Sequence, residues 1–126
     1  MPRILVVDDD VTMTGLIKAL LTMEGHETTT VNDSTTAVEV AASVNPDVIT
    51  LDLMMPGLTG FELCELLHQD PRLANIPIMI VSAKVDYESK AKARELGAKD
   101  YLTKPFGVED LLGKIKALAD DSKSGE

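Results

Sequence analysis

Short runs of apolar and β-branched residues alternate along the chain with stretches in which apolar residues recur at helical spacing. The runs cover residues 3–7, 47–51, 76–81 and 99–103, and a weaker, threonine-rich run covers residues 27–31. In the intervening stretches the apolar residues lie three or four positions apart, as one face of an amphipathic helix requires. The pattern therefore predicts a strand followed by a helix, repeated five times.

Glycine, proline and capping residues set the limits of the predicted helices. Gly25 ends the first helix, Pro46 follows the second and Gly97 ends the fourth. Thr59 and Glu62 have the spacing of a capping box at the start of the third. The apolar positions that define the five helices lie within residues 16–21, 37–42, 61–67, 87–96 and 111–118.

The character of the strands indicates how these units assemble. Nearly continuous apolar strands are typical of a parallel sheet that helices cover on both faces. The threonine-rich run at residues 27–31 is the least apolar, so we expect it at an edge of the sheet. The predicted fold is α/β, a three-layer, doubly wound (βα)5 arrangement of the flavodoxin-like type with strand order 2-1-3-4-5.

The length of 126 residues fits one domain. We expect that domain to cover residues 1–119, with residues 120–126 forming a polar tail or the start of a linker. No apolar run approaches the roughly 18 residues that a membrane span needs, and the N-terminal apolar run is too short for a signal peptide. A single cysteine, Cys64, excludes an internal disulfide, so we expect a cytoplasmic protein without a membrane partner.

A net charge of −9 makes direct nucleic-acid binding by this domain an unfavourable interpretation, because phosphate backbones require a basic surface. The chain has no Trp and only 3% aromatic residues, which also argues against a stacking platform for single strands. An acidic surface suits a protein partner or a metal ion, and most of the acid surplus serves solubility.

Polar residues follow the predicted strands at one rim of the sheet. Three aspartates, Asp8 to Asp10, follow the first strand, Asp52 follows the third, Ser82 the fourth and Lys104 the fifth. Ligands of open α/β sheets bind outside the carboxyl ends of the strands. We therefore expect carboxylates, a hydroxyl and an ammonium group to meet in one crevice.

This combination of groups predicts phosphoryl chemistry. Carboxylates that lie close together repel one another, and an all-oxygen set of ligands favours Mg²⁺. A lysine and a metal ion neutralise a transferring phosphoryl group, and a carboxylate can accept it. Asp52 is central and precedes a loop with Pro56 and Gly57, so it is the predicted acceptor. Asp8 and Asp9 suit metal binding, whereas Asp10 suits the N-cap of the first helix.

Four segments of the chain resemble the signature segments of response-regulator receiver domains. The resemblance covers about residues 3–119 and implies a phosphoacceptor switch of a two-component system rather than a conventional enzyme. The segments that carry it are Val6-Val-Asp-Asp-Asp10, Leu51-Asp-Leu-Met-Met-Pro-Gly57 with Gly60, Val81-Ser-Ala83 and Asp100-Tyr-Leu-Thr-Lys-Pro-Phe106.

The resemblance assigns roles at the rim. Asp52 accepts phosphate from a phosphohistidine on a sensor histidine kinase or phosphotransfer protein. Asp9, Asp52 and the backbone carbonyl of Met54 bind Mg²⁺ directly, and Asp8 holds it through water. Ser82 donates a hydrogen bond to the phosphoryl group and Lys104 pairs with one of its oxygens. The bond between Lys104 and Pro105 is expected to be cis.

The resemblance also implies how the signal leaves the site. Tyr101 stands at the aromatic switch position, whose ring turns inward on activation, so that the face of the fourth helix, fifth strand and fifth helix changes. Met54 and Lys84 stand at the positions that tune dephosphorylation. Because an apolar Met54 cannot orient an attacking water, a long-lived acyl phosphate is expected. A downstream protein or fused output domain and a homodimer formed on activation are the other expected partners.

Two alternatives to this interpretation remain open from the sequence. Asp8-Asp-Asp10-Val-Thr12 also matches the nucleophile motif of haloacid-dehalogenase-type phosphatases, with Asp8 as nucleophile and Asp10 as general acid. A receiver-like docking module that never takes phosphate is the other. We interpret Cys64 and His68 as packing and surface residues and His26 as a turn residue.

Overall fold

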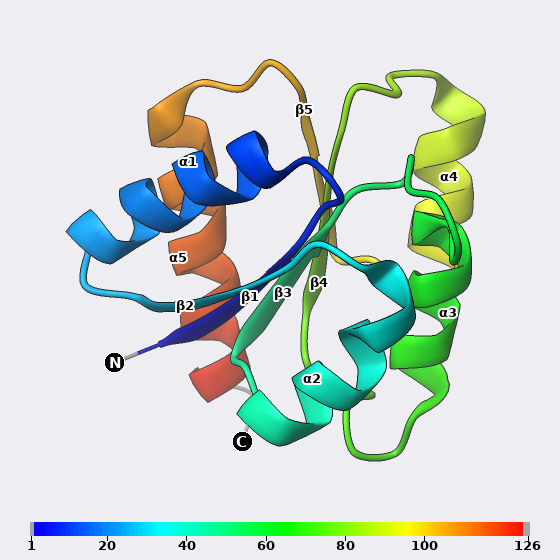
Figure 1. The fold of residues 1–126 in the computed structure, drawn as a ribbon, viewed down its shortest axis with the longest axis horizontal. Coiled ribbons are helices and arrows are strands. Elements are labelled where there is room, and N and C mark those ends of the chain that lie inside the picture. Colours follow the sequence, from blue (N-terminus) through cyan, green and yellow to red (C-terminus); the bar gives the residue numbers. More distant parts are fainter. Residues whose placement is uncertain (1, 125–126) are drawn as a thin grey trace.

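The computed structural model describes residues 2–124, which form a parallel sheet with helices on both faces (Figure 1). The strands pair in the order β2-β1-β3-β4-β5, so the predicted doubly wound (βα)5 fold is confirmed. The strands are β1 (Arg3–Val7), β2 (Glu27–Val31), β3 (Val48–Leu51), β4 (Ile78–Ser82) and β5 (Asp100–Thr103). The helices are α1 (Val11–Met23), η1 (Ser34–Thr36), α2 (Ala37–Val44), α3 (Gly60–Gln69), α4 (Tyr87–Glu95) and α5 (Val108–Ser124).

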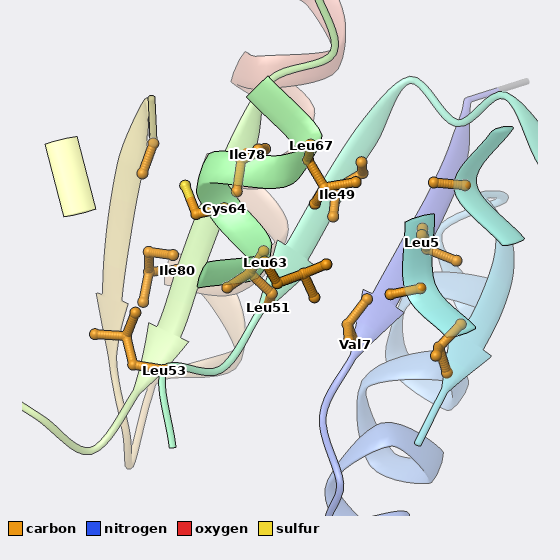
Figure 2. Packing of buried hydrophobic residues seen from close by; sticks show 14 of the residues in the cluster. Leu5, Val7, Ile49, Leu51, Leu53, Leu63, Cys64, Leu67, Ile78 and Ile80 are labelled. Atoms are coloured by element: carbon orange, nitrogen blue, oxygen red, sulfur yellow. The ribbon is translucent and has the colours of Figure 1, made fainter. Parts of the chain in front are cut away.

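Alternate residues of β1, β3 and β4 pack into two apolar layers, one on each face of the sheet. Helices α1 and α5 cover one face, where Ile17 and Ile115 pack on Ile4 and Val6. Helices α2, α3 and α4 cover the other face (Figure 1). Figure 2 shows Leu63 and Leu67 of α3 directed at β3 and β4. This packing fixes all five strands in one frame and leaves their carboxyl ends free to carry polar residues.

Side-chain caps start three of the helices at the carboxyl ends of the strands. The Asp10 carboxylate accepts from the first-turn amides of α1, which confirms its predicted role as N-cap. Thr59 and Glu62 form the predicted capping box at α3, and Asp86 caps α4. These caps define where the loops after β1, β3 and β4 end.

Strand β2 lies at the edge of the sheet, as its composition predicted. Its three threonines are only half buried. The predicted polar tail begins within α5, which continues to Ser124, because the chain has no glycine or proline between Gly113 and Gly125 to stop it. Within the described part of the chain, no helix is long and apolar enough to cross a membrane.

Candidate functional site

Four polar side chains predicted to share one rim lie at or just beyond the carboxyl ends of β1, β3, β4 and β5. Three of them are buried: Asp8 is 3% exposed, Asp52 8% and Ser82 0%. The fourth, Lys104, reaches Asp8 and Asp52 directly. Buried carboxylates are rare unless they are paired, so this burial indicates a preorganised polar site rather than a solvated loop.

Lys104 joins the two buried carboxylates. Its Nζ atom lies 2.6 Å from Oδ2 of Asp8 and 2.9 Å from Oδ2 of Asp52. The remaining oxygens accept backbone amides, Oδ1 of Asp8 from Asp10 at 3.0 Å and Oδ1 of Asp52 from Met54 at 3.1 Å. Both carboxylates are therefore held in fixed orientations by amides of their own loops and by the lysine that follows β5.

The three charges do not balance, since two carboxylates share one ammonium group. Burial raises the pKa of Asp8, and the hydrogen bond from Lys104 opposes this effect without cancelling it. Burial acts to lower the pKa of Lys104, but its hydrogen bonds to Asp8 and Asp52 outweigh this and the pKa is raised. The trio thus keeps a buried negative charge that a further cation can neutralise.

The donor chemistry of this rim fits Mg²⁺. The ion prefers oxygen ligands, keeps several waters and needs only one or two carboxylates. Asp8 and Asp52 supply buried carboxylate oxygens, and Asp9 is exposed beside them. Among the described residues, however, no cluster of three or more His, Cys, Asp or Glu could hold a metal ion. The structure thus brings Asp8 and Asp52 together through Lys104 and leaves Asp9 outside that contact.

Ser82 and Tyr101 meet at the loop between β4 and α4. The Ser82 hydroxyl accepts from the Lys84 amide at 3.3 Å, and the Tyr101 hydroxyl donates to the Lys84 carbonyl at 2.5 Å. Lys90 of α4 lies 5.4 Å from the centre of the Tyr101 ring. Burial raises the pKa of Tyr101, and a hydrogen bond with Ser82 partly offsets it. Tyr101 therefore links β5 to α4 and to the rim.

The backbone after β5 places Lys104. Its amide donates to the Ser82 carbonyl at 2.9 Å, which continues the β4–β5 pairing by one residue. The peptide bond between Lys104 and Pro105 is cis, as expected. The ammonium group of Lys104 consequently starts from a backbone position that is fixed to the end of β4.

Gly60 allows α3 to start directly against the end of β3. A Cβ atom at this position would lie 2.2 Å from the Asp52 carbonyl oxygen and 2.4 Å from the Leu53 Cα. Both are backbone atoms, so no side chain could move aside. The glycine noted after the acceptor motif is therefore required by close packing around Asp52.

Two side chains near the rim were not predicted from the sequence. Asn32 donates to the Asp8 carbonyl, and Ser34 bonds to the loop after Asp52. Both follow β2, the strand after which no site residue was predicted from the sequence. The rule that gathered Asp8 and Asp52 at the rim predicts that residues after β2 lie there too, but not which backbone atoms Asn32 and Ser34 contact.

The structure agrees with the interpretation of Cys64 and His68 as packing and surface residues and of His26 as a turn residue. Cys64 is buried, and burial raises its pKa to about 11. His68 is exposed, so the pair does not form a nucleophile and base. His26 lies between α1 and β2, and its buried Nδ1 atom has no hydrogen-bond partner among residues 2–124.

Comparison with known proteins identifies this architecture. The protein-family model of the response regulator receiver domain matches residues 4–116 of the sequence. The chain belongs to that family. Over 118 residues this receiver domain is 40% identical to the DNA-binding dual master transcriptional regulator RpaA of Synechocystis, and the match covers 94% of the chain. It covers 49% of RpaA, so the receiver domain spans about half the length of that relative.

Solved receiver domains have the same fold. The receiver domain of the Francisella response regulator 1452 is 34% identical, with a TM-score of 0.89 over 97% of this chain and 99% of that one. A CheY-like receiver domain protein from Methanospirillum hungatei is 26% identical, with a TM-score of 0.93 over 100% of this chain and 99% of that one. The similarity extends over essentially the whole described domain.

Membership of the family gives the general function. This receiver domain is a phosphoacceptor switch of two-component signalling, and receiver domains act with histidine kinases or phosphotransfer proteins. They are regulatory switches, and the family binds Mg²⁺ at its phosphorylation site. Membership of this family excludes the interpretation as a haloacid-dehalogenase-type phosphatase. That interpretation required Asp10 as the general acid, whereas the Asp10 side chain caps α1.

Proposed function

We propose that Asp52 is the phosphoryl acceptor of this receiver domain and that a phosphohistidine of a sensor kinase or phosphotransfer protein is the donor. The observation that carries the proposal is the contact of Lys104 with Asp52 at 2.9 Å and with Asp8 at 2.6 Å. Asp52 is central in this trio, since it ends the middle strand of the sheet. It is also the carboxylate whose own backbone carbonyl is packed directly against Gly60.

In the proposed reaction a carboxylate oxygen of Asp52 attacks phosphorus. The new P–O bond forms as the P–N bond to the donor imidazole breaks, and that imidazole nitrogen keeps the electron pair. Lys104 transfers one of its hydrogen bonds from the carboxylates to a phosphoryl oxygen, where its charge offsets the developing negative charge. After a small movement of the loop, the Ser82 hydroxyl donates a hydrogen bond to another phosphoryl oxygen.

Asp9, Asp52 and the backbone carbonyl of Met54 would hold Mg²⁺ directly, and Asp8 would hold it through water. When bound, the ion neutralises negative charge on the phosphoryl group. The support from this chain is the surplus negative charge of the Asp8, Asp52 and Lys104 trio. The exposure of Asp9 leaves its carboxylate free to turn toward an ion at the mouth of the site.

The signal would leave through Tyr101 and the face of α4, β5 and α5. The inward orientation of the Tyr101 ring would belong to the active state, and the hydrogen bond from its hydroxyl to the Lys84 carbonyl supports a link between this ring and the loop after Ser82. Phosphorylation would only need to shift a pre-existing equilibrium toward that orientation. Movement of Ser82 toward the phosphoryl group would also displace Tyr101, because both residues form hydrogen bonds with the backbone of Lys84.

Met54 and Lys84 would set the lifetime of the phosphorylated form. Met54 is 60% exposed, lies two residues after the acceptor and has no group that could orient a water for attack. The acyl phosphate is therefore expected to be long-lived, with slow self-catalysed hydrolysis and no external product. We propose that the domain is a switch rather than a conventional enzyme and that it acts in the cytoplasm.

The output would pass to a downstream protein or to a fused output domain, with homodimerisation on activation as one route. RpaA is described as DNA-binding and is about twice as long as this chain. The net charge of −9 does not favour DNA binding by the receiver domain itself. The dimer would use the α4, β5 and α5 face.

The test is a mass measurement of the intact protein after incubation with acetyl phosphate. The proposal expects one phosphoryl mass increment on the wild type with Mg²⁺, loss of the increment with chelator, and no increment on Asp52→Ala. An Asp10→Ala variant serves as the matched carboxylate control and should be labelled like the wild type. A folded wild type that takes no phosphate would instead support the docking module.

A further inference from the structure

The loop between β2 and α2 contacts both loops that carry the site carboxylates, although it gives the site no carboxylate of its own. The only acid in the loop, Asp33, accepts from the amide and hydroxyl of Thr35. The loop starts beside the site, because the Asp8 amide donates to the carbonyl of Val31 at 3.0 Å. The residues that follow Val31 then contact two different loops of the site.

Asn32 connects to the loop that holds Asp8 and Asp9. Its Nδ2 atom donates at 2.9 Å to the Asp8 carbonyl and at 2.9 Å to Oγ1 of Thr14. Thr14 is buried in α1 and donates in turn to the carbonyl of Val11 at 3.1 Å. Asn32 thus ties the backbone of a site carboxylate to the first turn of α1.

Ser34 connects to the loop that follows Asp52 and Met54. Its hydroxyl donates to the Pro56 carbonyl at 3.0 Å and accepts from the Leu58 amide at 3.1 Å. Ser34 is 2% exposed, so these bonds are shielded from water. Gly57, between the two partners, has a φ of +78°, and a Cβ there would lie 3.4 Å from Oγ of Ser34. The turn is therefore closely fitted to the serine.

We propose that Asn32 and Ser34 are positioning residues that brace the two acidic loops at the spacing required for metal binding and phosphoryl transfer. The proposal rests on the function proposed above. The physical need is clear from the charges, since Asp8 and Asp52 repel each other and Lys104 compensates only one of them. Neutral hydrogen bonds from a third loop restrain both backbones without adding charge to the site.

The test compares Asn32→Ala and Ser34→Ala with Thr36→Ala. Thr36 is in the same loop and donates its hydroxyl to the Asp33 carbonyl at 2.9 Å, so its replacement removes a hydrogen bond without touching either acidic loop. Mg²⁺ affinity of the unphosphorylated protein is measured by calorimetry, and urea unfolding verifies that each variant is folded. We expect Mg²⁺ affinity about tenfold weaker in both positioning variants and unchanged in Thr36→Ala.

A second readout separates positioning from a general structural defect. The rate of labelling by acetyl phosphate is measured as a function of Mg²⁺ concentration. In Asn32→Ala the half-saturating concentration should rise about tenfold, whereas the rate at saturating Mg²⁺ should approach that of the wild type. A variant that is merely less well folded would lower the saturated rate and leave the half-saturating concentration in place.

An Mg²⁺ affinity of Asn32→Ala equal to that of the wild type overturns the proposal, as does an equal loss in Thr36→Ala. If Ser34→Ala does not fold, Asn32→Ala decides alone, because the Asn32 side chain is at the surface. Failure of the proposed function is recognised separately. In that case the wild type takes no label on Asp52, whereas the calorimetric comparison can still be made.

Discussion

Nζ of Lys104 lies 2.6 Å from Oδ2 of Asp8, a residue 96 positions away in the sequence. The same nitrogen is 2.9 Å from Asp52, so one cation serves two buried carboxylates. An arrangement that leaves negative charge buried is costly for folding and is retained where a ligand or a reaction uses the charge. The ion pair therefore links the stability of the domain to its chemistry.

Asp8→Asn is expected to stabilise the domain in Mg²⁺-free buffer at pH 7. The change removes one of the two carboxylates that share Lys104, and an Asn oxygen still accepts a hydrogen bond. The free energy of unfolding in urea should rise by about 0.5–2 kcal/mol, the usual size of such a gain, while phosphorylation falls. Asp9→Asn, at an exposed position, should change stability by less than about 0.5 kcal/mol. A marked loss of stability in Asp8→Asn would show that the ion pair is net stabilising.

The same glycine-to-alanine substitution is expected to have opposite effects at two positions. At Gly60 the new Cβ would meet the Asp52 carbonyl at 2.2 Å, so the unfolding free energy should fall by about 1–3 kcal/mol. At Gly15, inside α1, nothing lies within 4 Å, so Ala should stabilise the helix by about 0.5–1 kcal/mol. Urea unfolding of both variants checks this. Equal effects at the two positions would exclude close packing as the reason for Gly60.

Tyr101→Phe removes the hydroxyl that donates to the Lys84 carbonyl. The loss of one such hydrogen bond should reduce the unfolding free energy by about 0.5–1.5 kcal/mol. Tyr87 is 84% exposed, so Tyr87→Phe is the matched control and should be within about 0.5 kcal/mol of the wild type. Indistinguishable stabilities of the two variants would argue that the Tyr101 hydroxyl does not hold the β4–α4 loop.

Cys64 should make the domain less stable at alkaline pH. Burial raises its pKa from 9.0 to about 11, so the unfolded chain releases the thiol proton first as the pH rises. The contribution of the neutral thiol is complete below about pH 9 and is lost between about pH 9 and 11. The stability difference between wild type and Cys64→Ala should therefore shrink over this interval. A stability difference that is constant across this pH interval would contradict the burial of the thiol.

The burial of Cys64 also predicts that, at pH 8, a thiol reagent should react with it only on unfolding.

Much of the fold was predictable because local signals agreed with the global arrangement. The apolar runs gave the strands, and the threonine content of residues 27–31 placed β2 at the edge. Asp8, Asp52, Ser82 and Lys104 could be placed together because the carboxyl ends of parallel strands share a rim. What could not be predicted is that Lys104 would engage both carboxylates while Asp9 stays exposed, since side-chain orientation depends on tertiary packing.

The contacts of Asn32 and Ser34 could not be predicted from the sequence pattern. Uncharged residues after an edge strand are ordinary turn residues in a sequence, and nothing local distinguishes them. Their partners are backbone atoms of Asp8, Pro56 and Leu58, which carry no sequence signal. Helix α5 likewise continued to Ser124 beyond its last apolar position, because a polar sequence without a breaker can extend a helix already docked on the core.

Chemical mapping of the phosphoryl group tests the central claim most directly. The domain is labelled with acetyl phosphate and Mg²⁺ and treated with borohydride, which reduces an acyl phosphate of aspartate to homoserine. Peptide masses then locate the converted residue. We predict conversion of Asp52 alone, lost when Mg²⁺ is chelated. Conversion at Asp8 or Asp9 with Asp52 unchanged would contradict the assignment of the acceptor and the roles built on it.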